Sequence, residues 1–78
     1  MPIAFVMITT EIGTMEEVRL ALKKLEGVEE AYSVYGVYDI VTKIRAESMD
    51  KLKEVVVENI RRLRNVRTTL TMIVIEGP

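Results

Sequence analysis

The chain has 78 residues, of which 49% are hydrophobic and 29% are charged, and its net charge is −1. This length supports a single domain over residues 1–78, the near-neutral charge gives nucleic acid no overall attraction, and no apolar run reaches the roughly 18 residues of a membrane span. Cysteine is absent, which excludes disulfides and thiolate metal sites, so we expect a cytoplasmic protein with no membrane partner.

The first predicted element is a strand at residues 2–9, P-I-A-F-V-M-I-T, which contains six consecutive apolar residues. The run is too short for a buried helix and indicates a strand covered on both faces. A helix is predicted next, from Thr14, because Thr14 and Glu17 give the T-x-x-E pattern of a capping box. Gly27 is expected to end this helix with a left-handed backbone.

A hairpin follows in the predicted order. Residues 28–34 alternate between two sides, Tyr35–Gly36 forms the turn, and residues 38–45 alternate again. A second helix is expected to open at Ser48 and a last strand to occupy residues 66–75. The apolar stripe of the second helix contains Leu52, Val55, Val56, Ile60 and Leu63.

An internal echo supports this order. L-E-G-V-E-E-A-Y-S-V (residues 25–34) resembles L-R-N-V-R-T-T-L-T-M (residues 63–72), and each runs from a helix end through Gly27 or Asn65 into a strand. Two β-α-β halves give β-α-β-β-α-β. The predicted fold class is therefore α+β, a ferredoxin-like sandwich with a four-stranded antiparallel sheet and two helices on one face.

Two helices cover only one face of such a sheet, yet residues 3–8 are apolar at both odd and even positions. An uncovered apolar face of this size is larger than monomers usually expose. We therefore expect a second subunit to cover it. From the alternation alone, Val6 and Ile73 are assigned to this uncovered face.

Candidate catalytic chemistry is sparse. Histidine and cysteine are absent, no carboxylates cluster at metal-ligand spacing, and no glycine-rich phosphate loop occurs, so we predict no enzyme activity, no metal and no cofactor. Histidine and glutamine are absent and charged residues are numerous, which favours a thermophilic source. One basic run could contact nucleic acid, but a solvated helix end explains it better. Its members are Arg61, Arg62, Arg64 and Arg67.

Asp39 is a carboxylate that lies inside the apolar pattern of the second hairpin strand. It could shape the turn, with Gly36 supplying positive φ and Asp39 accepting a local backbone hydrogen bond. It could instead bind the ammonium group of a ligand, because a carboxylate on a partly covered sheet face needs a partner. Tyr35 and Tyr38 could wall such a pocket. The residues alone leave both readings open.

Three stretches together resemble the effector-binding domain of the leucine-responsive/asparagine-regulator (Lrp/AsnC) family, also called the RAM domain. G-V-Y-D at residues 36–39 is similar to the family's G-x-Y-D, and N-V-R-T-T-L-T-M-I-V-I at residues 65–75 is similar to its closing strand with a T-x-T pattern. A-F-V-M-I-T-T-E-I-G at residues 4–13 fits its first strand and following glycine.

This resemblance implies a domain that dimerises through its sheets, builds rings of dimers and binds a free amino acid between dimers. By position, the effector would contact Gly36, Tyr38 and Asp39, with Thr69 and Thr71 supplying hydroxyl groups. The function implied is amino-acid sensing and oligomerisation in the transcriptional regulation of amino-acid metabolism. The resemblance does not identify which amino acid binds.

One departure from the family pattern concerns DNA. Typical members carry an N-terminal helix-turn-helix, whereas here the first predicted strand starts at residue 2. We therefore expect a stand-alone form with no direct nucleic-acid contact, which could co-assemble with full-length relatives. The alternatives are an ACT-like regulatory module, a small dimeric α+β-barrel enzyme, and a purely architectural oligomer without a ligand.

Overall fold

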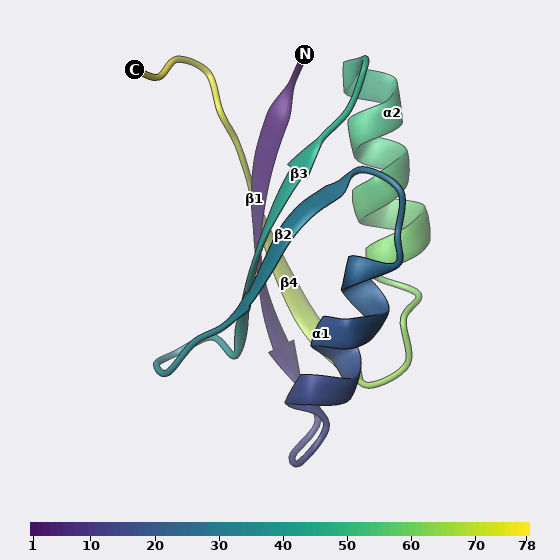
Figure 1. The fold of residues 1–78 in the computed structure, drawn as a ribbon, viewed down its shortest axis with the longest axis vertical. Coiled ribbons are helices and arrows are strands. Elements are labelled where there is room, and N and C mark those ends of the chain that lie inside the picture. The colour runs from purple at the N-terminus through teal and green to yellow at the C-terminus, as the bar shows by residue number, and fades with distance from the viewer.

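The structure is a computed structural model that describes residues 1–78. It has the predicted element order, with two helices on one face of a single sheet, and confirms the ferredoxin-like fold (Figure 1). Neither helix has the length and apolar character needed to cross a bilayer. The elements are β1 (Ile3–Thr10), α1 (Met15–Lys23), β2 (Val28–Ser33), β3 (Ile40–Arg45), α2 (Met49–Glu54), the π-helical segment η1 (Val55–Ile60) and β4 (Val66–Ile73).

The sheet is antiparallel throughout, with strand order β2-β3-β1-β4. β1 is therefore central and pairs with β3 from Ile3↔Arg45 to Ile8↔Ile40. On its other side β1 pairs with β4, where Ala4 lies opposite Ile73. A strand with neighbours on both sides and helices above it needs apolar residues along its length, which explains the apolar run in the sequence.

The core lies between the sheet and the helices. Alternate residues of β1 and β3 face the helices and are buried there, together with side chains of α1, α2 and η1. Val6 belongs to this buried layer, and Ile73 shares its face because it lies opposite Ala4. The assignment of Val6 and Ile73 to the uncovered face was wrong, since alternation separates two faces without identifying the one that the helices cover.

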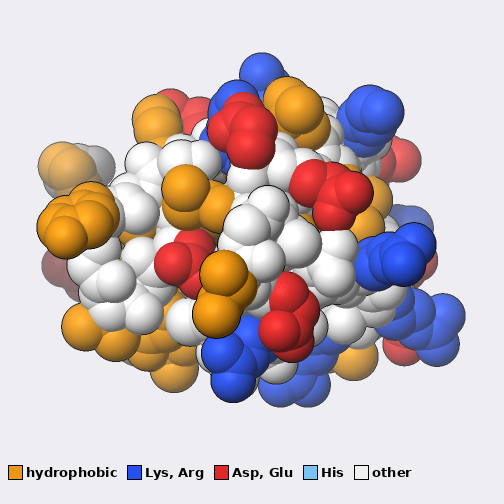
Figure 2. Space-filling view, turned by 90° about the horizontal axis from the view of Figure 1, so that it is seen from below, with side chains coloured by type: hydrophobic (Ala, Val, Ile, Leu, Met, Phe, Trp, Pro, Cys, Tyr) orange, Lys and Arg blue, Asp and Glu red, His pale blue; other side chains and the backbone are white.

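The opposite surface of the sheet is called the open face here. Its apolar side chains alternate with the buried ones along β1 and lie opposite one another across the strands. In Figure 2, hydrophobic side chains gather mostly on the left, the side away from the helices in Figure 1, whereas Lys and Arg gather mostly on the right. The open face is formed by Ile3, Phe5, Met7, Tyr32, Val41, Leu70 and Met72.

The start of α1 differs from the predicted capping box. The hydroxyl of Thr14 donates to the carbonyl of Glu11 at 2.6 Å and makes no cap bond to the helix. Glu17 instead accepts a hydrogen bond from the side-chain amide of Asn65 at 2.7 Å. This contact joins the first helix to the turn before β4, and it engages the carboxylate that a capping box would need.

The second helix begins as predicted and then widens. Ser48 caps it, because its Oγ accepts from the backbone N–H of Lys51 at 3.1 Å. From Val55 the helix is π-helical, and the N–H of Arg61 donates to the carbonyl of Val56, five residues earlier, at 3.2 Å. A wider turn lets Val55, Val56 and Ile60 all lie buried against the sheet.

The central hairpin is longer than a two-residue turn. Residues 34–39 form a loop closed by a hydrogen bond from the N–H of Val34 to the carbonyl of Asp39 at 2.9 Å, and β3 starts only at Ile40. β2 contains a register shift between Val28 and Glu30, which interrupts the strict alternation that the sequence suggested. The last strand ends at Ile73 rather than at residue 75.

The two turn residues that link helix to strand behave as the sequence echo indicates: φ is +94° at Gly27 and +74° at Asn65. At Gly27 a side chain is excluded twice, by the backbone conformation and by space. An added Cβ would lie 3.1 Å from Cγ2 of Val55 and 3.4 Å from the carbonyl oxygen of Arg45. Gly27 is thus fixed by the packing of the α1–β2 turn on the second helix.

We predict that Gly27→Ala lowers the free energy of unfolding by about 1–2 kcal/mol, the usual cost of a left-handed non-glycine residue. Urea denaturation followed by circular dichroism measures this change. Gly77→Ala is the matched control, because Gly77 lacks positive φ and an added Cβ meets no atom within 4 Å. If Gly27→Ala unfolds at the same urea concentration as wild type, a Cβ is tolerated at this turn and the packing argument for Gly27 is wrong.

Candidate functional site

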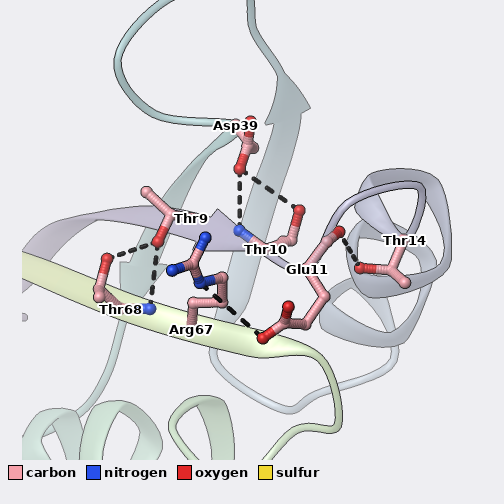
Figure 3. A network of polar contacts seen from close by, with 7 residues as sticks. All are labelled: Thr9, Thr10, Glu11, Thr14, Asp39, Arg67 and Thr68. Atoms are coloured by element: carbon pink, nitrogen blue, oxygen red, sulfur yellow. Dashed lines mark hydrogen bonds and ion pairs between the residues drawn. The ribbon is translucent and has the colours of Figure 1, made fainter.

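Asp39 lies where the hairpin loop meets the C-terminal end of β1. Its Oδ2 accepts hydrogen bonds from the backbone N–H of Thr10 at 2.8 Å and from the Thr10 hydroxyl at 3.4 Å (Figure 3). Its own N–H donates to the carbonyl of Ile8 at 2.9 Å. Side chain and backbone of Asp39 therefore both bind the last residues of β1, and both side-chain bonds use Oδ2, which leaves Oδ1 free to accept.

These contacts decide against a local turn role for Asp39. Its backbone donor, Thr10, is 29 residues away in the sequence rather than within the turn. Gly36 does not have positive φ, and a Cβ added there would meet no atom within 4 Å. The turn interpretation is therefore wrong for the side chain of Asp39 and for the backbone of Gly36, although the carbonyl of Asp39 does accept from Val34. The ligand interpretation of Asp39 stays a prediction.

The loop that carries Gly36 projects beyond the sheet, on the side away from the helices (Figure 1). Tyr35 is fully exposed and Val37 is 88% exposed, whereas Tyr38 is half-buried next to Asp39. Two large apolar side chains at the tip of a loop are unfavourable in water. Gly36, Tyr38 and Asp39 thus lie in one loop, together with the exposed Tyr35 and Val37.

Thr69 and Thr71 occupy a different place. They lie opposite Ile8 and Val6, on the helix-facing side of β4. Arg61 donates its Nε–H to the hydroxyl of Thr69 at 3.3 Å, and Thr71 lines a cleft of about 200 Å³ between β4 and the second helix. β4 and the loop that ends at Asp39 flank β1 on opposite sides, about 10 Å apart at ordinary strand spacing. Within one chain, the two threonines and Asp39 share no pocket.

Other hydroxyl groups lie at the C-terminal end of β1, where that of Thr10 contacts Asp39. The hydroxyls of Thr9 and Thr68 are 2.5 Å apart, and the N–H of Thr68 donates to the Thr9 hydroxyl at 3.2 Å (Figure 3). Sequence reasoning missed Thr9, Thr10 and Thr68. Only the strand register reveals this cluster, because β1, β4 and the hairpin loop meet there from three distant segments.

A larger cleft, of about 310 Å³, lies elsewhere, between the α1–β2 turn, the end of β3 and the second helix. Its cations are already paired: Nε of Arg45 is 2.5 Å from Glu29, and Nζ of Lys51 is 3.5 Å from Glu54. The hydrogen bond from Arg45 lowers the pKa of Glu29. None of the five predicted site residues lines this cleft.

Several of the remaining charged groups are paired within the chain. No group of three or more Asp, Glu, His or Cys side chains could hold a metal ion. In the basic run, Arg61 binds Thr69, Arg62 pairs with Glu58 at 3.2 Å and Arg67 pairs with Glu11 at 3.8 Å. Most of this run therefore makes contacts within the chain.

Comparison with known proteins agrees with the resemblance seen in the sequence. The model of one family, described as the Lrp/AsnC ligand binding domain, matches residues 3–78. An uncharacterized HTH-type transcriptional regulator of Pyrococcus furiosus, PF0250, is 35% identical over 60 residues, which are 77% of this chain and 40% of that protein. The chain thus spans well under half the length of this regulator.

Solved structures show the same fold. The crystal structure of FFRP-DM1 has a TM-score of 0.92 and 36% identity, over 96% of this chain and 100% of that one. A transcriptional regulator from Neisseria meningitidis, NMB0573, solved as an L-Met complex, has a TM-score of 0.84 at 14% identity, over 96% of this chain and 50% of that one. At that identity the second likeness concerns the fold alone. These matches favour the Lrp/AsnC resemblance over the ACT-like and barrel-enzyme alternatives.

Proposed function

The chain belongs to the Lrp/AsnC ligand-binding domain family, and from this premise we propose that residues 1–78 form one amino-acid-sensing and oligomerisation domain. The relatives that it matches are named as transcriptional regulators, which supports a role in transcription regulation. The effector would be a free amino acid, as the printed ligand of the Neisseria regulator suggests by analogy. Regulation of amino-acid metabolism is the process that the family resemblance implies.

The observation that carries this proposal is the geometry of Asp39. Thr10 fixes Oδ2 through its backbone N–H at 2.8 Å, so the carboxylate is held in place before any ligand arrives. Oδ1 remains able to accept, and an α-ammonium group would donate a charge-assisted hydrogen bond to it, which is stronger than a bond between neutral groups. A pre-positioned carboxylate also spares the ligand the cost of ordering it.

Gly36 supports the same site. Neither its backbone conformation nor the space around it requires a glycine within the chain. A residue without Cβ leaves its N–H and C=O open to close approach by a ligand or another subunit. Tyr38, half-buried beside Asp39, would wall the ligand on the loop side.

Thr69 and Thr71 enter the proposal through a second subunit. Because they lie on the far side of β1 from Asp39, one small amino acid bound to Asp39 is out of reach of both threonines of the same chain. A pocket between chains removes this difficulty, since Asp39 of one subunit could face the threonines of another. The ligand carboxylate would then accept from the threonine hydroxyls.

The open face supports the dimer that the family resemblance implies. Leu70 and Met72 are nearly half exposed and lie opposite Met7 and Phe5, so an apolar surface runs across β1 and β4. Covering this face with the same face of a second copy would remove it from water. We propose that such dimers assemble further into rings. Longer relatives could join these assemblies through the same surfaces.

The first prediction separates ligand binding from the contact with Thr10. Asp39→Asn keeps an oxygen that can accept from Thr10 and removes the charge. We expect the amino-acid affinity to fall roughly ten- to a hundredfold, because a hydrogen bond to a charged group is worth about 1.5–3 kcal/mol. A thermal-shift screen of the twenty amino acids first identifies the ligand, because a ligand at 100 times its Kd adds about 2.7 kcal/mol to the free energy of unfolding. Isothermal titration calorimetry then measures the affinity of wild type and variant.

Gly36→Ala is the matched second variant. It should change the free energy of unfolding by no more than about 0.5 kcal/mol, as surface substitutions usually do. It should nevertheless lower the amino-acid affinity, because the added Cβ would cover the backbone amide of residue 36. If Asp39→Asn binds the amino acid as well as wild type does, Asp39 only fixes the end of β1 and the proposed site is wrong. Asp39→Ala would then reduce stability alone.

The second prediction concerns the open face. Met72→Glu places a charge there and should cost the assembly about 3 kcal/mol or more, roughly a hundredfold in the dissociation constant. Sedimentation velocity at micromolar concentration should show the particle losing at least half its mass. Leu20→Glu on α1 is the control, since Leu20 is 47% and Met72 is 44% exposed. A monomeric wild type would refute the dimer.

The third prediction is that the 78-residue chain does not bind DNA sequence-selectively. Direct readout needs an element that fits a groove and carries side chains to base edges, and both helices here use their apolar faces on the sheet. A gel-shift assay with the purified chain measures this, and a sequence-selective shift that persists in high salt would overturn it.

A further inference from the structure

The larger of the two clefts, of about 310 Å³, lies at the opposite end of β3 from Asp39. Its lining comes from the α1–β2 turn, from the end of β3 and from the second helix. Asp39 directly precedes the first residue of β3, so the length of this six-residue strand, about 20 Å, separates the cleft from Asp39. No residue of β4 and none of the open face lines the cleft. A ligand bound there would meet neither the proposed amino-acid site nor the surfaces assigned to assembly.

Part of the lining of this cleft is apolar. Gly27, Ala46 and Val55 carry no polar side-chain atom, and an added Cβ on Gly27 would lie only 3.1 Å from Cγ2 of Val55. Such a lining suits methylene groups of a ligand. A volume of about 310 Å³ is at the lower limit of ligand pockets, which restricts the occupant to a small molecule.

The charged groups around the cleft differ in whether they have a partner. Glu26, on the α1–β2 turn, and Glu47, between β3 and α2, make no hydrogen bond or ion pair within the chain. Both cations of the lining, in contrast, are paired with a carboxylate, Arg45 with Glu29 and Lys51 with Glu54. The charges left uncompensated in the cleft are therefore two carboxylates, supplied by two separate segments.

Asn59 adds a third polar group without a partner. It lies on the π-helical segment η1, is half-buried and lines the cleft, yet its side-chain amide makes no hydrogen bond within the chain. An amide that is partly withdrawn from water favours a site where it gains a partner. π-helical turns are rare and are frequent at functional sites. The segment that widens the second helix is thus the one that contributes Val55 and Asn59 to the cleft.

We propose that this cleft binds a small aliphatic diamine, with one ammonium group on Glu26, the other on Glu47 and the methylene chain over Ala46 and Val55. Ammonium groups donate charge-assisted hydrogen bonds to carboxylates, which are stronger than bonds between neutral groups. Each ammonium group has three donors, so one of them can also donate to the amide oxygen of Asn59. Every unpartnered polar side chain of the lining then has a partner.

Other classes of small ligand fit the cleft less well. An anion would find its cations already paired and two free carboxylates beside them. A free amino acid has one ammonium group, and its own carboxylate would lie near the second glutamate. Mg²⁺ and Ca²⁺ take six or more oxygen ligands, whereas no group of three or more Asp, Glu, His or Cys side chains in this chain could hold a metal ion. Two positive charges joined by an apolar chain match the lining best.

An NMR titration of the isotope-labelled wild-type chain with 1,4-diaminobutane tests the site, at a physiological salt concentration that screens exposed charges. Saturable shifts are expected at the amides of Gly27, Ala46 and Asn59, with none at Asp39. Butylamine has the same carbon chain and one ammonium group, and should bind roughly tenfold more weakly (about 1.4 kcal/mol). Equal affinity for the two amines, or the same shifts with magnesium chloride, overturns the proposal and leaves the amino-acid site untouched.

Charge-removing variants provide the second readout. Glu26→Gln and Glu47→Gln should each reduce the affinity for 1,4-diaminobutane roughly tenfold, to that of butylamine, because one carboxylate remains. Glu11→Gln, beyond the other end of β1, removes the same charge and should leave the affinity unchanged. All three side chains are exposed, so the fold is expected to survive each change. If Glu11→Gln weakens binding as much as the other two variants do, net charge alone attracts the diamine and the proposed site is wrong.

Discussion

The central position of β1 is the constraint on which the other elements depend. Its backbone is bonded to β3 on one side and β4 on the other, and its alternate side chains, Ala4, Val6 and Ile8, are fully buried beneath the helices. Any shift of β1 by one residue would exchange its two faces and move this buried row into the open face. The register of β1 therefore fixes the core, the open face and the positions of both neighbouring strands at once.

Asp39 marks the end of that ladder, which explains a carboxylate inside an apolar pattern. Beyond Ile8 the strand β1 continues to Thr10, whose N–H has no partner in β3 because β3 begins only at Ile40. Oδ2 of Asp39 accepts from this N–H, so a side chain completes what the shorter strand leaves unpaired. The same arrangement orients the carboxylate, which is why a structural role and the proposed ligand role do not exclude each other.

The order of elements was predictable because it rests on local signals: apolar runs, helical spacing and two turn residues with positive φ, Gly27 and Asn65. The failures concern contacts between distant segments. The capping box at Thr14 failed because Glu17 binds Asn65, 48 residues away, and the assignment of Val6 failed because alternation does not say which face the helices cover. The contacts of Asp39 with Thr10 and of Thr9 with Thr68 exist only once the strands are in register, so no spacing in the sequence could indicate them.

Thr69 and Thr71 connect ligand binding with the proposed assembly. Their hydroxyls are the groups assigned to the carboxylate of an amino acid, and within one chain they lie on the far side of β1 from Asp39. A ligand bound by Asp39 and by these hydroxyls would therefore bridge two subunits and stabilise their association. By thermodynamic reciprocity, the factor by which the ligand changes association equals the factor by which association changes ligand affinity. A pocket shared between subunits would thus give the domain a physical route from amino-acid concentration to assembly size, without any change of fold.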